Sequence, residues 1–192
     1  MNRRFRATTT FAIAMTIALS LFAIDRSAWC ETSKRDIDAL AKGELVYIAT
    51  IRKDGNQSTA APVWFTVTPD HLVLINTGPD TWKAKRIRRG SPVIVWIDDE
   101  NGPAFIGKAE ITTEPAALKQ IIEDYPKKYL QARIGLHKPT QETFVKGDRV
   151  AIKITPIRDL PDGFTSKPGT PPPTLDAHWM AAKFSSMANQ HR

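Results

Sequence analysis

The sequence of 192 residues predicts a mainly β domain of the α+β class, an antiparallel barrel with short flanking helices. Three observations support this fold class. Six short segments rich in β-branched and aromatic residues recur along the chain. Turn signals separate them, and most connections are too short to hold a crossover helix. Only two or three segments have helical spacing, so helices can cover the barrel but cannot alternate with its strands.

The first half of the barrel is predicted to contain a helix over 31–43 and strands over 45–52, 58–68 and 71–77. Gly43 is placed to end the helix. Asp54-Gly55 is a strong hairpin signal between the first two strands. Pro62 has no amide hydrogen, so its strand should have an edge, a bulge or a strand start at that position.

A short basic helix is predicted directly after the strand over 71–77 and a Gly-Pro turn. Asp80 or Thr81 can cap this helix, because a side-chain oxygen there can accept a hydrogen bond from the free amides of the first turn. Lys83 would then lie beside the positive end of the helix, an arrangement that suits a phosphate. The pattern predicts an anchor for a phosphorylated cofactor at Lys83, helped by Lys85 or Arg88.

The second half is predicted to contain strands over 93–97 and 104–113, a helix over 114–129 and a last strand over 149–157. The last two strands alternate apolar and polar residues, which is typical of strands with one buried face. Pro126 is expected to end or kink the helix, because proline cannot donate a backbone hydrogen bond.

Residues 1–30 are predicted to form an export signal peptide. A basic start precedes an apolar run over 11–24, which is shorter than the roughly 20 residues of a membrane-spanning helix. Cleavage is expected before Glu31 and would leave a periplasmic or secreted protein with no stable membrane insertion. The alternative is an uncleaved segment that anchors the chain.

The barrel domain is expected to span residues 31–160, because the composition changes beyond this point. Residues 161–174 are rich in proline, which is typical of an extended or loosely ordered linker. Residues 175–192 are predicted to form a C-terminal helix that packs on the barrel or on a partner subunit. Few basic residues lie on this helix, which disfavours a role at a membrane surface.

The residues give little support to hydrolytic, metal-dependent or nucleic-acid-binding functions. The chain has one cysteine, Cys30, and its four histidines lack the spacing of metal ligands. The motifs of serine hydrolases, nucleotide-binding P-loops and dinucleotide-binding folds are not present. The formal net charge of +7 falls to +4 without residues 1–30, a modest excess for a protein that binds nucleic acid.

Chemistry carried by a cofactor needs none of these motifs. A flavin brings its own reactive atom, so the protein must supply a phosphate anchor and a flat slot for the ring. Lys83 suits the anchor, and Trp64 and Phe65 suit the slot. A solvated basic face and an ordinary core are the alternative interpretations of these residues.

Three runs, 61–65, 77–89 and 106–110, resemble in order and spacing the pyridoxamine 5′-phosphate oxidase-like flavoproteins, over residues 45–158. The resemblance implies a split β-barrel homodimer with FMN, or in some members a deazaflavin, at the subunit interface. It also implies that the strand 61–66, the strand end at 76–77 and Lys83 contact the cofactor. The cofactor-binding residues expected on this basis are Val63, Trp64, Phe65, Thr66, Asn76, Thr77, Trp82 and Lys83.

The chain departs from the oxidase pattern at several positions. Trp82 stands where the oxidase has arginine, and Ala61 and Thr66 replace basic residues. The C-terminal arginine and histidine of the oxidase have no evident match. We therefore expect a small FMN- or deazaflavin-dependent oxidoreductase that moves hydride to or from an unknown substrate, with catalytic residues unknown. The alternatives are a non-catalytic flavin- or ligand-binding module and, more remotely, a basic surface-binding protein.

Overall fold

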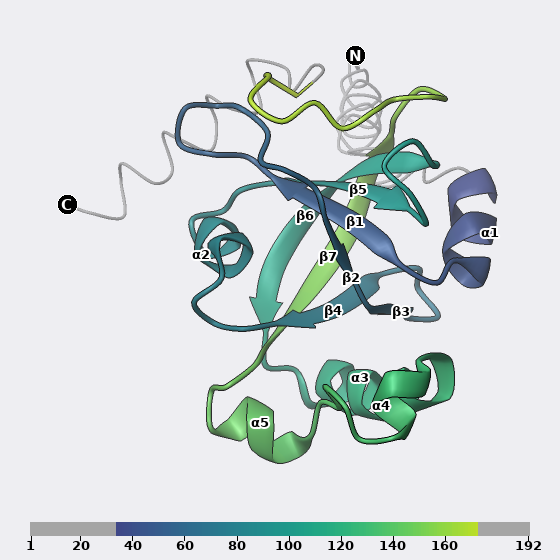
Figure 1. Cartoon of the computed structure of the whole chain (residues 1–192), viewed down its shortest axis with the longest axis vertical. Coiled ribbons are helices and arrows are strands. Elements are labelled where there is room, and N and C mark those ends of the chain that lie inside the picture. Colours follow the sequence, from purple (N-terminus) through teal and green to yellow (C-terminus); the bar gives the residue numbers. More distant parts are fainter. Residues whose placement is uncertain (1–33, 173–192) are drawn as a thin grey trace, which may run out of the picture. The chain divides into compact units, whose positions relative to one another are not determined.

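Seven antiparallel strands form one strongly curved sheet in the computed structural model, which describes residues 34–172 (Figure 1). The strand order is β2-β1-β5-β6-β7-β4-β3. A single residue, Trp64, separates the two outermost strands in sequence, so the sheet closes on itself into a nearly complete barrel. The predicted mainly β barrel is confirmed. Its strands are β1 (Val46–Thr50), β2 (Ala61–Val63), β3 (Phe65–Val67), β4 (Val73–Thr77), β5 (Val93–Ile97), β6 (Ala104–Thr112) and β7 (Val150–Asp159).

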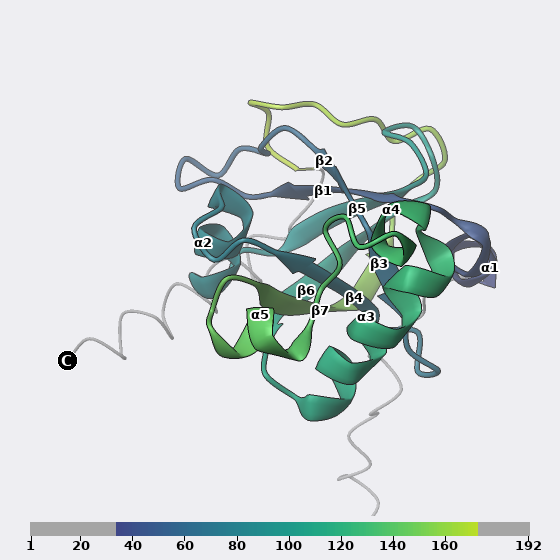
Figure 2. The same ribbon diagram turned by 60° about the horizontal axis from the view of Figure 1, so that its bottom comes forward.

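Short helices flank the barrel, as predicted. α3 packs on β3 and β4, with α4 and α5 beside it (Figure 2). α4 and α5 were not predicted, because four or five residues are too few to show a helical period. The helices are α1 (Lys34–Lys42), α2 (Trp82–Arg88), α3 (Pro115–Lys128), α4 (Leu130–Arg133) and α5 (Gln141–Val145).

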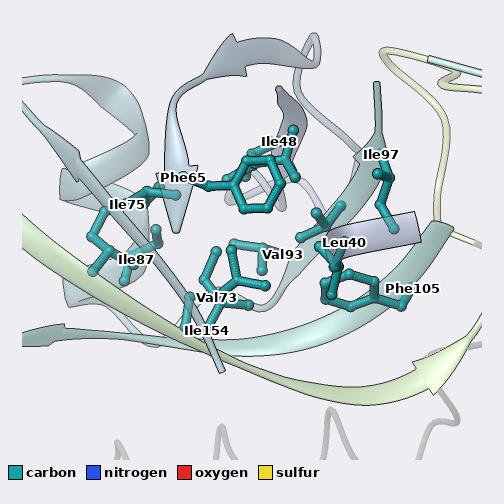
Figure 3. Close-up of a cluster of buried hydrophobic side chains, with 14 residues drawn as sticks. Leu40, Ile48, Phe65, Val73, Ile75, Ile87, Val93, Ile97, Phe105 and Ile154 are labelled. Carbon is teal, nitrogen blue, oxygen red and sulfur yellow. The ribbon is translucent and has the colours of Figure 1, made fainter. Parts of the chain in front are cut away.

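The barrel interior is filled by apolar side chains from six of the strands and from α1 and α2 (Figure 3). Along β5, side chains that point into the barrel alternate with side chains that point out of it. Val93, Val95 and Ile97 point into the barrel, while Ile94 and Trp96 pack outside it against residues such as Leu160. Both faces of β5 are therefore buried, which explains why this segment is apolar throughout.

The predicted strand 58–68 is in fact two strands, which is a correction to the sequence-based assignment. β2 pairs with β1 and β3 pairs with β4, so the chain changes partners at Trp64. The hydroxyls of two tyrosines form hydrogen bonds with the backbone groups at this point. The Phe65 amide donates to the Tyr129 hydroxyl at 2.8 Å, and the Tyr125 hydroxyl donates to the Trp64 carbonyl at 2.7 Å. Pro62 lies in an edge strand, as its missing amide hydrogen requires.

Replacing Tyr129 with phenylalanine should lower the free energy of unfolding by about 1–3 kcal/mol, because the Phe65 amide would stay buried without a partner. Urea unfolding followed by circular dichroism measures this change. The matched control is Tyr47→Phe, since no hydrogen bond of the Tyr47 hydroxyl is found among the described residues. Equal stabilities of the two variants would contradict a role for the Tyr129 hydroxyl.

The chain beyond β7 lies along the barrel as far as the structure describes it. The Phe164 ring stacks on Trp96 with 5.8 Å between ring centroids, and the Trp96 indole donates to the Phe164 carbonyl at 2.8 Å. Further along the chain, the backbone amide of Gln57 donates to the Thr170 carbonyl at 2.8 Å. This part of the predicted linker is therefore held against the strands, beside the turn that follows β1.

The predicted signal peptide, residues 1–30, and the predicted C-terminal helix, residues 175–192, lie outside the described residues. Within residues 34–172, no helix has both the length and the apolar character needed to cross a membrane.

Candidate functional site

Two neighbouring hollows lie along β2. The cationic hollow, of about 480 Å³, is formed by β1, β2, the end of β4 and α2. The aromatic hollow, of about 410 Å³, is formed by β2, the end of β4, α3 and the segment around His137. Thr77 lines both. Together they form a candidate site with two chemically different parts.

The cationic hollow combines positive charge with hydroxyl groups. Its cations are Arg52, Lys83 and Arg86, and none of the described residues that line it is acidic. Its hydroxyls belong to Thr50, Ser58, Thr59, Thr77 and Thr81. Ammonium, guanidinium and hydroxyl donors are the groups that bind phosphate oxygens in proteins. This hollow is therefore suited to an anionic, oxygen-rich ligand.

The packing of α2 directs its cations into this hollow. Thr81 caps the helix by accepting a hydrogen bond from the Ala84 amide at 3.2 Å, which settles the choice between the two predicted caps. Ala84 and Ile87 are buried against the barrel. Lys83 and Arg86, three positions apart and thus neighbours on the helix surface, both face the hollow.

Lys83 is half-buried, and the structure shows no hydrogen bond or ion pair for its ammonium among residues 34–172. Its burial lowers the pKa of this ammonium to about 8. The other two cations are held: Arg52 pairs with Asp54 at 2.7 Å, and Arg86 donates to the Thr50 hydroxyl at 3.1 Å. A bound anion would relieve the cost of keeping Lys83 charged, because an opposite charge favours the protonated form.

The predicted helpers of Lys83 are placed differently from the expectation. Lys85 approaches Asp80 at 3.6 Å, and Arg88 donates to the Pro79 carbonyl at 2.7 Å. Neither lines the cationic hollow, whereas Arg86 does.

The aromatic hollow has a flat wall beside a fixed polar group. Trp64 stacks on Tyr129 with 4.6 Å between centroids and an angle of 8° between the planes. Beside it, the Arg149 guanidinium donates to the Asn76 side-chain oxygen at 3.0 Å. Apolar walls with a few oriented polar groups are typical of small-molecule sites. This hollow therefore suits a planar ring with polar edges.

Six of the eight predicted cofactor-binding residues line the two hollows. Trp82, Lys83 and Thr77 line the cationic hollow, and Val63, Trp64, Asn76 and again Thr77 line the aromatic one. The other two side chains do not line either hollow.

Phe65 points into the barrel core and is fully buried, so its side chain cannot form a wall of the predicted slot (Figure 3). Thr66 is buried under α3, where its hydroxyl donates to Asp124 at 2.8 Å. Alternation explains Phe65: its neighbour Trp64 faces outward, so the next side chain points inward.

Sequence reasoning missed several lining residues. Among them are Thr50, Arg52, Ser58, Thr59, Arg86, Tyr125, His137 and Arg149. Only Arg86 carried a usable local signal, its helical spacing from Lys83. The described part of the chain contains no group of three or more histidine, cysteine or acidic residues that could hold a metal ion.

Comparison with known proteins yields one family and several solved structures. The family model of pyridoxamine 5′-phosphate oxidase matches residues 35–158. No curated protein matches the chain.

Three solved structures illustrate the structural likeness. A protein of unknown function from Agrobacterium tumefaciens is 14% identical, with a TM-score of 0.50 over 70% of this chain and 59% of that one. A conserved hypothetical protein from Mycobacterium tuberculosis is 23% identical, with a TM-score of 0.49 over 74% and 96%. An F420 reductase is 18% identical, with a TM-score of 0.44 over 64% and 94%. At such identities the likeness concerns the fold alone.

Proposed function

The chain belongs to the pyridoxamine 5′-phosphate oxidase family, and from this premise we propose that it is a flavin-dependent oxidoreductase of the split β-barrel kind. FMN is the proposed cofactor, with a deazaflavin as the alternative. The observation that carries the proposal is Lys83, a half-buried ammonium without a partner among the described residues, in a hollow that adjoins a flat aromatic wall.

The donor groups of the two hollows fit a flavin mononucleotide. Lys83 and Arg86 would neutralise its phosphate, and the hydroxyls around them, such as that of Thr77, match a ribityl chain. Trp64 would cover the ring and exclude water, while Arg149 holds the Asn76 amide in one orientation at its edge. A flavin bound there would supply the hydride-transfer chemistry that side chains lack.

The proposed substrate is a small molecule other than pyridoxamine 5′-phosphate. Thr66 stands where the oxidase pattern has a basic residue, and here its hydroxyl is bound to the Asp124 carboxylate. Burial raises the pKa of Asp124, but the hydrogen bonds from Lys127 and from the Thr66 hydroxyl together outweigh this effect and hold the pKa below its ordinary value, so the carboxylate is charged at neutral pH. Thr66 lines neither hollow, so what it supports is the difference from the oxidase pattern: a hydroxyl held by a carboxylate replaces the basic residue.

We further propose that the protein is exported and forms a homodimer. The basic start and apolar run within residues 1–30 support export. Ala61 and Pro62 are exposed on β2, an edge strand, which leaves room for a partner subunit beside the two hollows.

A visible absorption spectrum of the purified full chain, before and after titration with FMN, tests the proposal. We expect a yellow protein that binds one flavin, becomes reduced by a nicotinamide donor and is reoxidised by an added acceptor. Bound flavin without any turnover would favour the non-catalytic flavin-binding module. A colourless protein that binds neither FMN nor a deazaflavin would refute both functions.

A further inference from the structure

The segment that follows the barrel contacts a turn that forms part of the cationic hollow. We propose that residues 160–172, the strap, hold the turn 52–57 in place, and that Gln57 is the positioning residue through which the strap acts on the hollow. The inference rests on the proposed function, because the property that the strap controls is the affinity of the hollow for FMN. The family model ends at residue 158, so the strap lies outside the matched part of the chain.

The turn carries one wall of the cationic hollow. It begins at Arg52 and is followed by Ser58 and Thr59, and all three residues line the hollow. An isolated bridge between Ile51 and Gln57 joins the two ends of the turn, outside the regular pairing of β1 with β2. A short hairpin is only marginally stable by itself, so the position of this turn depends on what packs against it.

The strap is the segment that packs against the turn (Figure 1). The backbone amide of Gln57 donates to the Thr170 carbonyl at 2.8 Å, and the Gly169 amide donates to the Gln57 carbonyl at 3.0 Å. The side-chain amide of Gln57 also donates to the Pro171 carbonyl at 3.3 Å. Only 1% of Gln57 is exposed, so its backbone groups need these partners, which water cannot replace.

The other end of the strap is attached to the outside of the barrel. Phe164 stacks on Trp96 with 5.8 Å between ring centroids, and its carbonyl accepts a hydrogen bond from the Trp96 indole at 2.8 Å. Leu160 is buried in the same apolar cluster as Ile51, and its amide donates to the Ala104 carbonyl at 2.7 Å. The strap therefore links β5 and β6 to the turn.

The strap can influence a ligand only through the turn, because none of the described residues 160–172 lines either hollow. Release of the strap frees the wall that carries Arg52 and Ser58, and the hollow then loses affinity for its ligand. Thermodynamic linkage requires the converse: a bound ligand stabilises the docked strap by the same factor. A strap that merely covers the outer strands has no such coupling.

Hydrogen exchange of the full chain, measured by mass spectrometry with and without saturating FMN, tests this coupling. Bound FMN should slow exchange in the strap, including that of the Gly169 amide, by roughly two- to tenfold, the factor that about one net hydrogen bond supplies. The helix α1, which lines neither hollow, is the control segment and should exchange at the same rate in both samples.

Variants in the full chain test the role of Gln57. Gln57→Ala should weaken FMN binding in isothermal titration by roughly two- to tenfold. The matched control is Gln120→Ala, because the Gln120 side-chain amide also donates to a backbone carbonyl, that of Val67 at 2.9 Å, but lines neither hollow. It should change the affinity less than twofold. Phe164→Ala should act like Gln57→Ala, and Phe164→Tyr, which keeps the stacked ring, should retain most of the affinity.

The possible failures can be told apart. Unchanged exchange in the strap on FMN binding, or equal affinities of the two glutamine variants, would overturn the inference and leave the proposed function standing. So would slower exchange that accompanies a change of oligomeric state in size-exclusion chromatography, because a subunit interface would then cover the strap. Absence of FMN binding by the wild-type chain would overturn the inference and the proposed function together.

Discussion

Lys83→Ala is expected to weaken flavin binding by about ten- to a hundredfold, since a charge-assisted contact contributes roughly 1.5–3 kcal/mol. Lys83 is the lining cation without a protein partner among the described residues, so its contribution to the bound anion is not shared with another contact. Fluorescence titration with FMN measures the effect. The thermal midpoint should stay the same or rise, because the substitution removes a half-buried unpaired charge.

Two variants and a pH series make this result specific. Lys83→Arg should retain most of the affinity, and Lys85→Ala, on the same helix but outside the hollow, should change it less than twofold. Burial lowers the pKa of Lys83 in the flavin-free protein to about 8. The side chain is therefore charged at pH 7 and loses its proton as the pH rises through 8. FMN affinity should therefore fall between pH 7.5 and roughly 9.5, where an ordinary lysine would still be charged. A flat profile, or a larger loss in Lys85→Ala, would contradict the anchor role.

Phe65→Ala should lower the free energy of unfolding by about 3–5 kcal/mol, the usual cost of removing a large aromatic side chain from a packed core. Phe65 is fully buried in the barrel, among residues such as Ile48, Val73 and Val93 (Figure 3). Truncation leaves a cavity that this close-packed interior can fill only in part. Urea unfolding of the flavin-free protein measures the change.

Trp82→Ala is the matched control for an aromatic residue, because Trp82 is largely exposed. It should change the free energy of unfolding by no more than about 0.5 kcal/mol. A small effect of Phe65→Ala on stability, together with a large loss of flavin affinity, would mean that Phe65 faces the cofactor as the sequence alone suggested.

The fold was largely predictable because its elements have strong local signals. β5 and β7 agree with their predicted ranges to within about two residues, and α2 has the predicted cap at Thr81. The partner exchange at Trp64 was not predictable from the pattern. β2 and β3 belong to one apolar run, and the break between them coincides with hydrogen bonds to the hydroxyls of Tyr125, in α3, and of Tyr129, directly after α3.

The candidate site was predictable where its residues belong to a local motif or a strand end, as Lys83 and Thr77 do. It was not predictable where packing brings distant segments together. Arg52 and Thr59 reach the cationic hollow because β1 pairs with β2 and α2 packs on β1, contacts that a linear pattern does not contain. Phe65 was wrongly expected in the slot, because an aromatic residue beside Trp64 suits a core and a flat pocket equally well.

The exchange of partners at Trp64 also bears on how the chain folds. The two edges of the sheet are joined by this one residue, so the barrel cannot close until every other strand is in register. The residues that pair in these registers are far apart in sequence: Val46 pairs with Ile97, and Thr77 pairs with Val150. Contacts of such separation slow folding, and β-rich topologies of this kind need roughly milliseconds to seconds. Closure at Trp64, secured by α3, is therefore expected as a late step, and the outer wall of the aromatic hollow would be among the last parts to form.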